Sequence, residues 1–212
     1  MIDDKKRKFR VILEDCPVIA AVKDETGLKE CLYSESQIIF LLFGDICSVG
    51  RYVEIAKSAG KMVFVHMDLI NGLGNKEVAV DFIREHTGVD GIISTKPQLV
   101  KRAKELGLFG ILRIFVIDSM AFGNIEKQCA SLVPDAVEIL PGLMPKIIRQ
   151  VHSLHRTPLI AGGLIRDKED TMSALSAGAI SISTSCEEAW QELDAGAPAS
   201  AKQFLKGRDV RG

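Results

Sequence analysis

Two stretches rich in glycine or hydroxyl side chains follow the last two apolar runs of the chain. Residues 161–166 read "AGGLIR" and residues 181–186 read "SISTSC". Glycines let backbone N–H groups approach an anion closely, and hydroxyl groups can donate hydrogen bonds to it. The candidate phosphate ligands are Gly162, Gly163, Ser183, Thr184 and Ser185. The structural alternative is a glycine turn followed by an ordinary helix N-cap at Ser185, with Glu188 completing a capping box.

Charged or titratable side chains also interrupt other apolar runs. His66 and Asp68 stand two residues apart, so on a strand both point the same way. Arg113 and Glu138 lie inside the runs "ILRIFVI" and "AVEIL". Desolvating an unpaired ion costs several kcal/mol, so we expect an Arg113–Glu138 or Arg113–Asp68 ion pair. A ligand role is compatible with such a pair, because Asp68 and Glu138 could accept hydrogen bonds from a polyol.

A third kind of chemistry would use Lys23, which follows the first apolar run. Lys23 could complement a negatively charged group of a ligand. Together with His66 and Asp68 it could also support proton transfer, as in sugar-phosphate isomerases, epimerases and aldolases. A small barrel enzyme acting on a sugar or polyol phosphate is therefore the alternative to a ligand sensor without catalytic residues.

The elements that must position these residues are eight short apolar runs rich in Ile and Val. They begin at Pro17, Gln37, Met62, Gly91, Ile111, Ala136, Pro158 and Ala179, and segments with helical spacing separate them. Continuous apolar runs are typical of parallel strands that are covered on both faces. Eight strand–helix units predict an α/β fold, a (β/α)8 TIM barrel in a single compact domain. A doubly wound open sheet is the alternative.

In a TIM barrel the carboxyl ends of the strands form the ligand-binding mouth, and phosphates bind to the loops after strands seven and eight. The stretches at 161–166 and 181–186 should therefore meet. Residues 17–193 are expected to form the barrel. Residues 1–16 form a basic arm, with "KKRKFR" at 5–10, that we expect to dock below the barrel, and residues 194–212 should be a mobile tail.

Composition narrows the class of protein. The chain has 212 residues, 47% of them hydrophobic, and a formal net charge of −1, which argues against a surface that attracts polyanions everywhere. Its five cysteines form no CxxC pair, so neither a disulfide framework nor a metal site is predicted. No run has the length of a membrane span or the pattern of a secretory signal. We expect a cytoplasmic protein that contacts no membrane.

Six strings taken together resemble the glycerol-3-phosphate-responsive antiterminator family of bacterial glycerol-uptake operons. They are "VHMDLINGL", "DGIIST", "RIFVIDSMA", "VEILPGLMP", "PLIAGGLIRDKED" and "SAGAISISTSCEEAW". The resemblance implies a barrel that binds glycerol 3-phosphate at its mouth and acts on leader mRNA so that polymerase reads through a terminator. This chain departs from the family pattern at Lys96, where relatives tend to have Arg, and at Cys186, where they tend to have Asn.

The resemblance also implies roles for individual residues. The phosphate would contact Gly162, Gly163, Thr184 and Ser185, and the glycerol hydroxyls would lie near Asp68, Glu138 and Arg113. The implied effector is glycerol 3-phosphate, with no further cofactor. The expected partners are leader mRNA, the transcription machinery as an alternative receiver of the signal, and a second copy of the chain. Aromatic residues make up only 6% of the chain, so RNA contact by base stacking is not expected.

Overall fold

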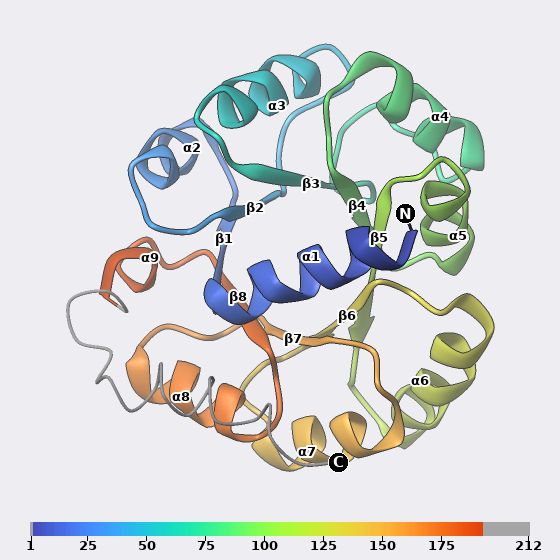
Figure 1. Ribbon diagram of the computed structural model, residues 1–212, viewed down its shortest axis with the longest axis vertical. Coiled ribbons are helices and arrows are strands. Elements are labelled where there is room, and N and C mark those ends of the chain that lie inside the picture. Colours follow the sequence, from blue (N-terminus) through green and yellow to red (C-terminus); the bar gives the residue numbers. More distant parts are fainter. Residues whose placement is uncertain (1, 193–212) are drawn as a thin grey trace.

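The strands of the protein form a closed parallel barrel in sequence order, as the computed structural model of residues 2–192 shows (Figure 1). The strands are β1 (Val18–Val22), β2 (Ile38–Leu41), β3 (Met62–His66), β4 (Gly91–Ser94), β5 (Phe109–Phe115), β6 (Ala136–Leu140), β7 (Leu159–Gly162) and β8 (Ser181–Thr184). β1 pairs with β8 and closes the ring. The predicted TIM barrel is confirmed, and the open sheet is wrong.

Helices follow each strand and cover the outside of the barrel (Figure 1). They are α2 (Glu25–Leu32), α3 (Val49–Ser58), α4 (Glu77–His86), α5 (Pro97–Glu105), α6 (Ser119–Leu132), α7 (Pro145–Leu154), α8 (Lys168–Ser176) and α9 (Ala189–Glu192). Three of them begin at an aspartate whose carboxylate accepts a hydrogen bond from the third residue after it, namely Asp24, Asp118 and Asp167. Such caps satisfy N–H groups that lack a partner inside the helix.

The barrel interior is mainly apolar at the amino-terminal ends of the strands and becomes polar at the carboxyl ends of several of them. Every second residue faces inward, and Ile19, Phe64 and Ile111 lie in one buried apolar cluster in the lower part of the barrel. Continuing the same alternation to the carboxyl ends brings Arg113 and Glu138 to the mouth. The strand period of two therefore explains why charged residues interrupt the apolar runs where they do.

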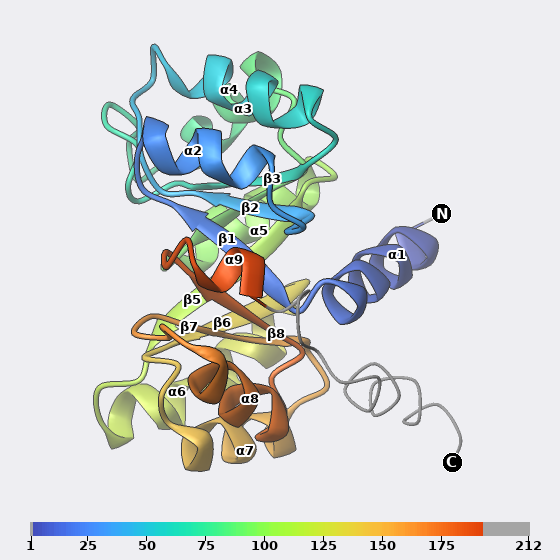
Figure 2. The ribbon, with the colours of Figure 1, turned by 90° about the vertical axis from the view of Figure 1, so that its left-hand side faces the viewer.

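The basic arm is a helix, α1 (Ile2–Asp15), that lies across the amino-terminal end of the barrel (Figures 1 and 2). Phe9 and Leu13 are buried against the inward-facing side chains of the barrel strands. The Phe9 ring centroid lies 4.6 Å from that of Phe109 and 5.4 Å from that of Phe64. The predicted tail at 194–212 lies outside the described residues.

The segment after β8 differs from the prediction. The capping-box pattern predicted a helix beginning at Ser185, but α9 begins at Ala189 and has only four residues. The Cys186 backbone N–H donates to the Thr184 hydroxyl, and the Trp190 indole N–H donates to the Thr184 carbonyl oxygen. The Ala189 N–H donates to the Cys186 carbonyl oxygen and the Trp190 N–H to the Glu187 carbonyl oxygen, three residues back instead of the four of an α-helix, so this segment is a turn.

Candidate ligand site at the barrel mouth

A buried ion pair occupies the centre of the mouth. Arg113 and Glu138 are register partners on β5 and β6, and Arg113 Nε lies 2.5 Å from Glu138 Oε2. The other carboxylate oxygen of Glu138 accepts a hydrogen bond from the Ser183 hydroxyl. Of the two predicted pairings of Arg113, the one with Glu138 is therefore present. Because Glu138 is fully buried, these two donors compensate the cost of desolvating its charge.

The ion pair, rather than a bound anion, explains why position 162 requires a glycine. A Cβ atom at Gly162 would lie 2.5 Å from Glu138 Oε1 and 2.6 Å from Ser183 Oγ. Any side chain would push apart the group that holds the Glu138 carboxylate. Gly162 does not line the mouth cavity described below.

A cavity of about 390 Å³ opens at the mouth between the ends of β1 and of β5 to β8. It brings together seven of the predicted site residues: Lys23, Arg113, Glu138, Gly163, Ser183, Thr184 and Ser185. The prediction missed the other lining residues, which are Ala21, Leu42, Leu140, Leu164, Ile165, Arg166 and Cys186. The loops after strands seven and eight therefore do meet in one cavity.

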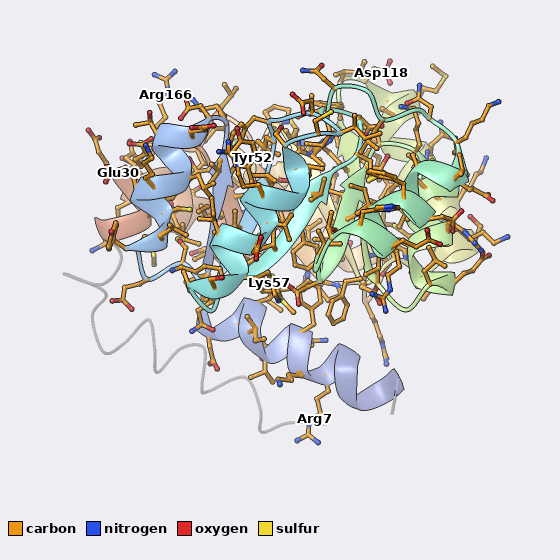
Figure 3. The ribbon with its side chains drawn as sticks, turned by 90° about the horizontal axis from the view of Figure 1, so that it is seen from above. Arg7, Glu30, Tyr52, Lys57, Asp118 and Arg166 are labelled. Atoms are coloured by element: carbon orange, nitrogen blue, oxygen red, sulfur yellow. The ribbon has the colours of Figure 1, made fainter. Side chains whose placement is uncertain are left out.

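The loop after β7 turns through two consecutive left-handed residues. Gly163 has φ +75° and Leu164 has φ +65°. A glycine adopts this conformation without steric cost, whereas a leucine there is strained. A Cβ at Gly163 would also lie 3.1 Å from Leu140. The turn directs Arg166 to the cavity end of the barrel, where Figure 3 shows it opposite α1.

The loop after β8 uses most of its hydroxyl groups internally. The Ser183 hydroxyl is bound to Glu138, and the Thr184 hydroxyl donates to the Ile165 carbonyl oxygen at 2.6 Å. The second bond ties the β8 loop to the β7 loop. Ser185 is exposed, and its hydroxyl makes no hydrogen bond within the part of the chain that the structure describes. Of these three hydroxyl groups, that of Ser185 is therefore the one available to a ligand.

The charges that line the cavity are predominantly positive. Lys23, Arg113 and Arg166 contribute cations, and Glu138 is the one carboxylate among the lining residues. Lys23 and the Arg166 side chain have no ion-pair partner among residues 7–190, the part of the chain whose side chains the structure describes. A cavity with this excess of unpaired cations is suited to an anionic ligand such as a phosphate ester.

A second polar cluster lies on the other side of the mouth, at the ends of β3 and β4. Asp68 accepts hydrogen bonds from Lys96 Nζ at 2.7 Å, from the Thr95 backbone N–H at 2.7 Å and from the Ser94 hydroxyl. Burial raises the pKa of Asp68, but these three donors outweigh it and hold the pKa below its ordinary value. The predicted Arg113–Asp68 pairing is absent among the described contacts, because Lys96 is the cation beside Asp68.

His66 belongs to this second cluster. It is buried, its Nδ1 atom makes no hydrogen bond among the described residues, and that atom lies 3.8 Å from Asp68 Oδ2. Burial, and then the nearby charge of Arg113, lower the pKa of His66 to about 4, although Asp68 acts in the opposite direction. The imidazole is therefore neutral near pH 7. Neither His66 nor Asp68 lines the cavity that contains Lys23.

Residues 7–190 contain no cluster of three or more His, Cys, Asp and Glu side chains that could hold a metal ion. No helix in that range is long and apolar enough to cross a membrane. The cysteines there are free, and Cys186 is the one that lines the cavity.

Comparisons with known proteins give a consistent result. The profile of the family "Glycerol-3-phosphate responsive antiterminator" matches residues 18–190. An Escherichia coli K12 protein named as the uncharacterized protein YgcP is 47% identical over 179 residues, which span 84% of this chain and 94% of that protein. α1 lies outside the family match.

Two solved structures are also similar. The glycerol uptake operon antiterminator regulatory protein of Listeria monocytogenes has a TM-score of 0.79 and 32% identity, over 82% of this chain and 94% of that one. A glycerol uptake operon antiterminator-related protein of Thermotoga maritima has a TM-score of 0.73 and 37% identity, over 82% and 96% of the two chains.

Proposed function

The chain belongs to the glycerol-3-phosphate responsive antiterminator family, and from that premise we propose that it is a transcription antiterminator regulator with glycerol 3-phosphate as its effector. The effector binds in the mouth cavity. The loaded protein acts on the leader mRNA of a glycerol-uptake operon and allows polymerase to read through a terminator. No cofactor besides the effector is needed for this activity.

The observation that carries the proposal is the excess of unpaired cations in a cavity built from the loops after β7 and β8. The phosphate of the ligand would lie against Gly163 and Ser185. The cations of Lys23 and Arg166 would neutralise its negative charge. Charge-assisted hydrogen bonds of this kind are about twice as strong as neutral ones. A volume of about 390 Å³ is ample for a ligand as small as a glycerol phosphate.

The glycerol hydroxyl groups would lie toward the Arg113–Glu138 pair at the floor of the cavity. Such a pair offers both a donor and an acceptor to a hydroxyl group, so it can distinguish the ester from inorganic phosphate. Asp68 was also expected to bind a hydroxyl. We assign it instead to holding Lys96, because three residues already donate hydrogen bonds to its carboxylate.

Regulation requires that glycerol 3-phosphate bind the RNA-competent state more tightly than the alternative state. A change of 5- to 150-fold in RNA affinity corresponds to a coupling free energy of about 1–3 kcal/mol. The hydrogen bond from Thr184 to the Ile165 carbonyl oxygen joins the two loops of the cavity. A ligand that orders one loop would therefore order the other.

The test is the affinity of the protein for leader RNA with and without glycerol 3-phosphate, measured at several salt concentrations because phosphate contacts are salt-dependent. We expect the effector to raise the affinity by at least about fivefold. Identical affinities at every salt concentration would contradict the coupling. If crosslinking instead captures the transcription machinery without RNA, the signal passes through a protein partner.

An enzyme acting on a sugar or polyol phosphate is the second candidate, favoured by the neutral His66 beside the Lys96–Asp68 pair. A neutral imidazole and a lysine could relay a proton. We would incubate the protein with glycerol 3-phosphate, dihydroxyacetone phosphate and pentose phosphates and follow them by NMR. Turnover of any of these would favour the enzyme, and unchanged spectra would remove its support.

A further inference from the structure

Large apolar side chains are exposed at the mouth where β5, β6 and β7 end. We call Phe115, Ile117, Met120, Leu143 and Leu164 the rim patch. Phe115 is the last residue of β5, Met120 lies in the first turn of α6, and the other three lie in the connections after β5, β6 and β7. β6 lies between the other two strands in the barrel. Ile117 is 80% exposed and Met120 is 74% exposed. Clusters of exposed apolar residues of this kind mark interaction sites on soluble proteins.

The backbone holds the rim patch in its exposed position. The Val116 N–H donates to the Leu140 carbonyl oxygen, which keeps the chain extended beyond the end of β5. Val116 is buried, so Phe115 and Ile117 both lie on the opposite, exposed side. Leu164 is presented by the left-handed turn after β7. These side chains are therefore fixed outward by ordered backbone.

The composition of the rim patch fits a protein partner better than RNA. It has one aromatic ring, and two exposed acidic residues, Asp118 and Asp167, flank it. Protein surfaces that bind RNA use cations to contact the phosphates and several aromatic rings to stack on the bases. Phe and Met are enriched in the cores of protein interfaces, where charged residues are depleted.

The charges at its two ends make the rim patch complementary to itself. Asp118 lies at the β5 end and Arg166 at the β7 end, both on the face opposite α1 (Figure 3). Asp118 Oδ1 caps α6 by accepting from Ala121, and its carboxylate is exposed. The Arg166 guanidinium has no partner within the described chain. A two-fold rotation about Leu143 would bring each carboxylate opposite a guanidinium.

We propose that the rim patch binds a second copy of this chain, in a two-fold dimer whose mouths face each other and whose two Asp118–Arg166 pairs flank an apolar centre. The Arg166 guanidinium carries five N–H donors, so it can face the partner's Asp118 and the ligand cavity of its own chain at the same time. The first test is the mass of the full chain in solution, measured by sedimentation over a concentration range of about two orders of magnitude. We expect a dimer. A monomer over the whole range would overturn the proposal.

Apolar contacts are tested by Ile117→Asp and Met120→Asp. Each should raise the dimer dissociation constant by at least about tenfold, because it places a charge in the apolar centre. Val78→Asp is the matched control, because Val78 is 66% exposed on α4, outside the rim patch. A dimer that survives both rim variants would use a different surface, which would contradict the proposal.

The charge pairs give a sharper test. Asp118→Arg alone and Arg166→Asp alone each oppose like charges across the axis, so both variants should be monomeric. Mixing the two proteins in equal amounts should restore a dimer, because every Arg then faces an Asp. The lost cap of α6 is present in both the Asp118→Arg sample and the mixture, so it cannot produce the restoration. Failure of the mixture to dimerise would exclude this two-fold arrangement.

Discussion

Both sides of the barrel mouth contain cationic side chains, but they differ in whether these cations have a partner within the protein. At the ends of β3 and β4, three residues donate hydrogen bonds to the Asp68 carboxylate, and Lys96 Nζ has two acceptors, Asp68 and Asn75. On the cavity side, Arg113 is paired, whereas Lys23 and Arg166 have no acceptor in the described part of the chain. Charges that are paired within the protein already have their partners, whereas unpaired charges in a cavity can bind a ligand.

The largest expected effect on the free energy of unfolding comes from removing the buried Glu138 carboxylate. Glu138→Ala leaves Arg113 buried without its partner, and breaking such a pair should lower the free energy of unfolding by about 3–5 kcal/mol. Asp68→Ala breaks a pair that is less buried and should cost less. Urea denaturation of the two variants measures both. Equal losses would show that the two ion pairs do not differ in this way.

A pH dependence of stability is expected from the β3–β4 side. The pKa of His66 is about 4 in the folded protein and about 6.5 when unfolded, so the unfolded chain binds more protons between these values. The stability contributed by neutral His66 is complete above pH 6.5 and should fall by up to about 3 kcal/mol as the pH drops to 4. His66→Asn should remove this dependence. The exposed His86→Asn is the control and should retain it.

For the cavity side, Gly163→Asp should reduce the affinity for glycerol 3-phosphate by at least about a hundredfold, because it adds strain and a negative charge where the phosphate must approach. Gly60→Asp is the matched control. Gly60 also has positive φ, +77°, and a Cβ there would meet no atom within 4 Å. Calorimetry should find normal binding in the control. Normal binding by folded Gly163→Asp protein would exclude this phosphate position.

A smaller loss of binding is expected from Arg166→Gln, which removes a cation but keeps a polar side chain. We expect glycerol 3-phosphate to bind about tenfold more weakly. Arg149→Gln, on the exposed surface of α7, should leave affinity unchanged. Equal behaviour of the two variants would mean that Arg166 does not contact the ligand.

The smallest effect should be that of Asp68→Ala on ligand affinity. Asp68 is bound to Lys96 and does not line the cavity, so glycerol 3-phosphate affinity should change by less than about threefold. Calorimetric titration measures the change. A loss as large as that of Arg166→Gln would move the glycerol hydroxyls to the β3–β4 side of the mouth.

The barrel was predictable from the sequence because each strand is a short apolar run, and the period of two placed Arg113 and Glu138 at the mouth. The loops were predictable only in part. Whether a hydroxyl is free depends on tertiary neighbours, and those of Ser183 and Thr184 are used by Glu138 and the Ile165 carbonyl. Arg166 was missed because nothing local distinguishes it from an ordinary exposed arginine.

The most direct test of the central claim is a calorimetric titration of the protein with glycerol 3-phosphate, with glycerol and inorganic phosphate as controls. Saturable binding of the ester, tighter than that of either fragment, is the predicted result, because the cavity offers cations for the phosphate and the Arg113–Glu138 pair for the hydroxyl groups. Absence of binding by the folded protein would contradict it.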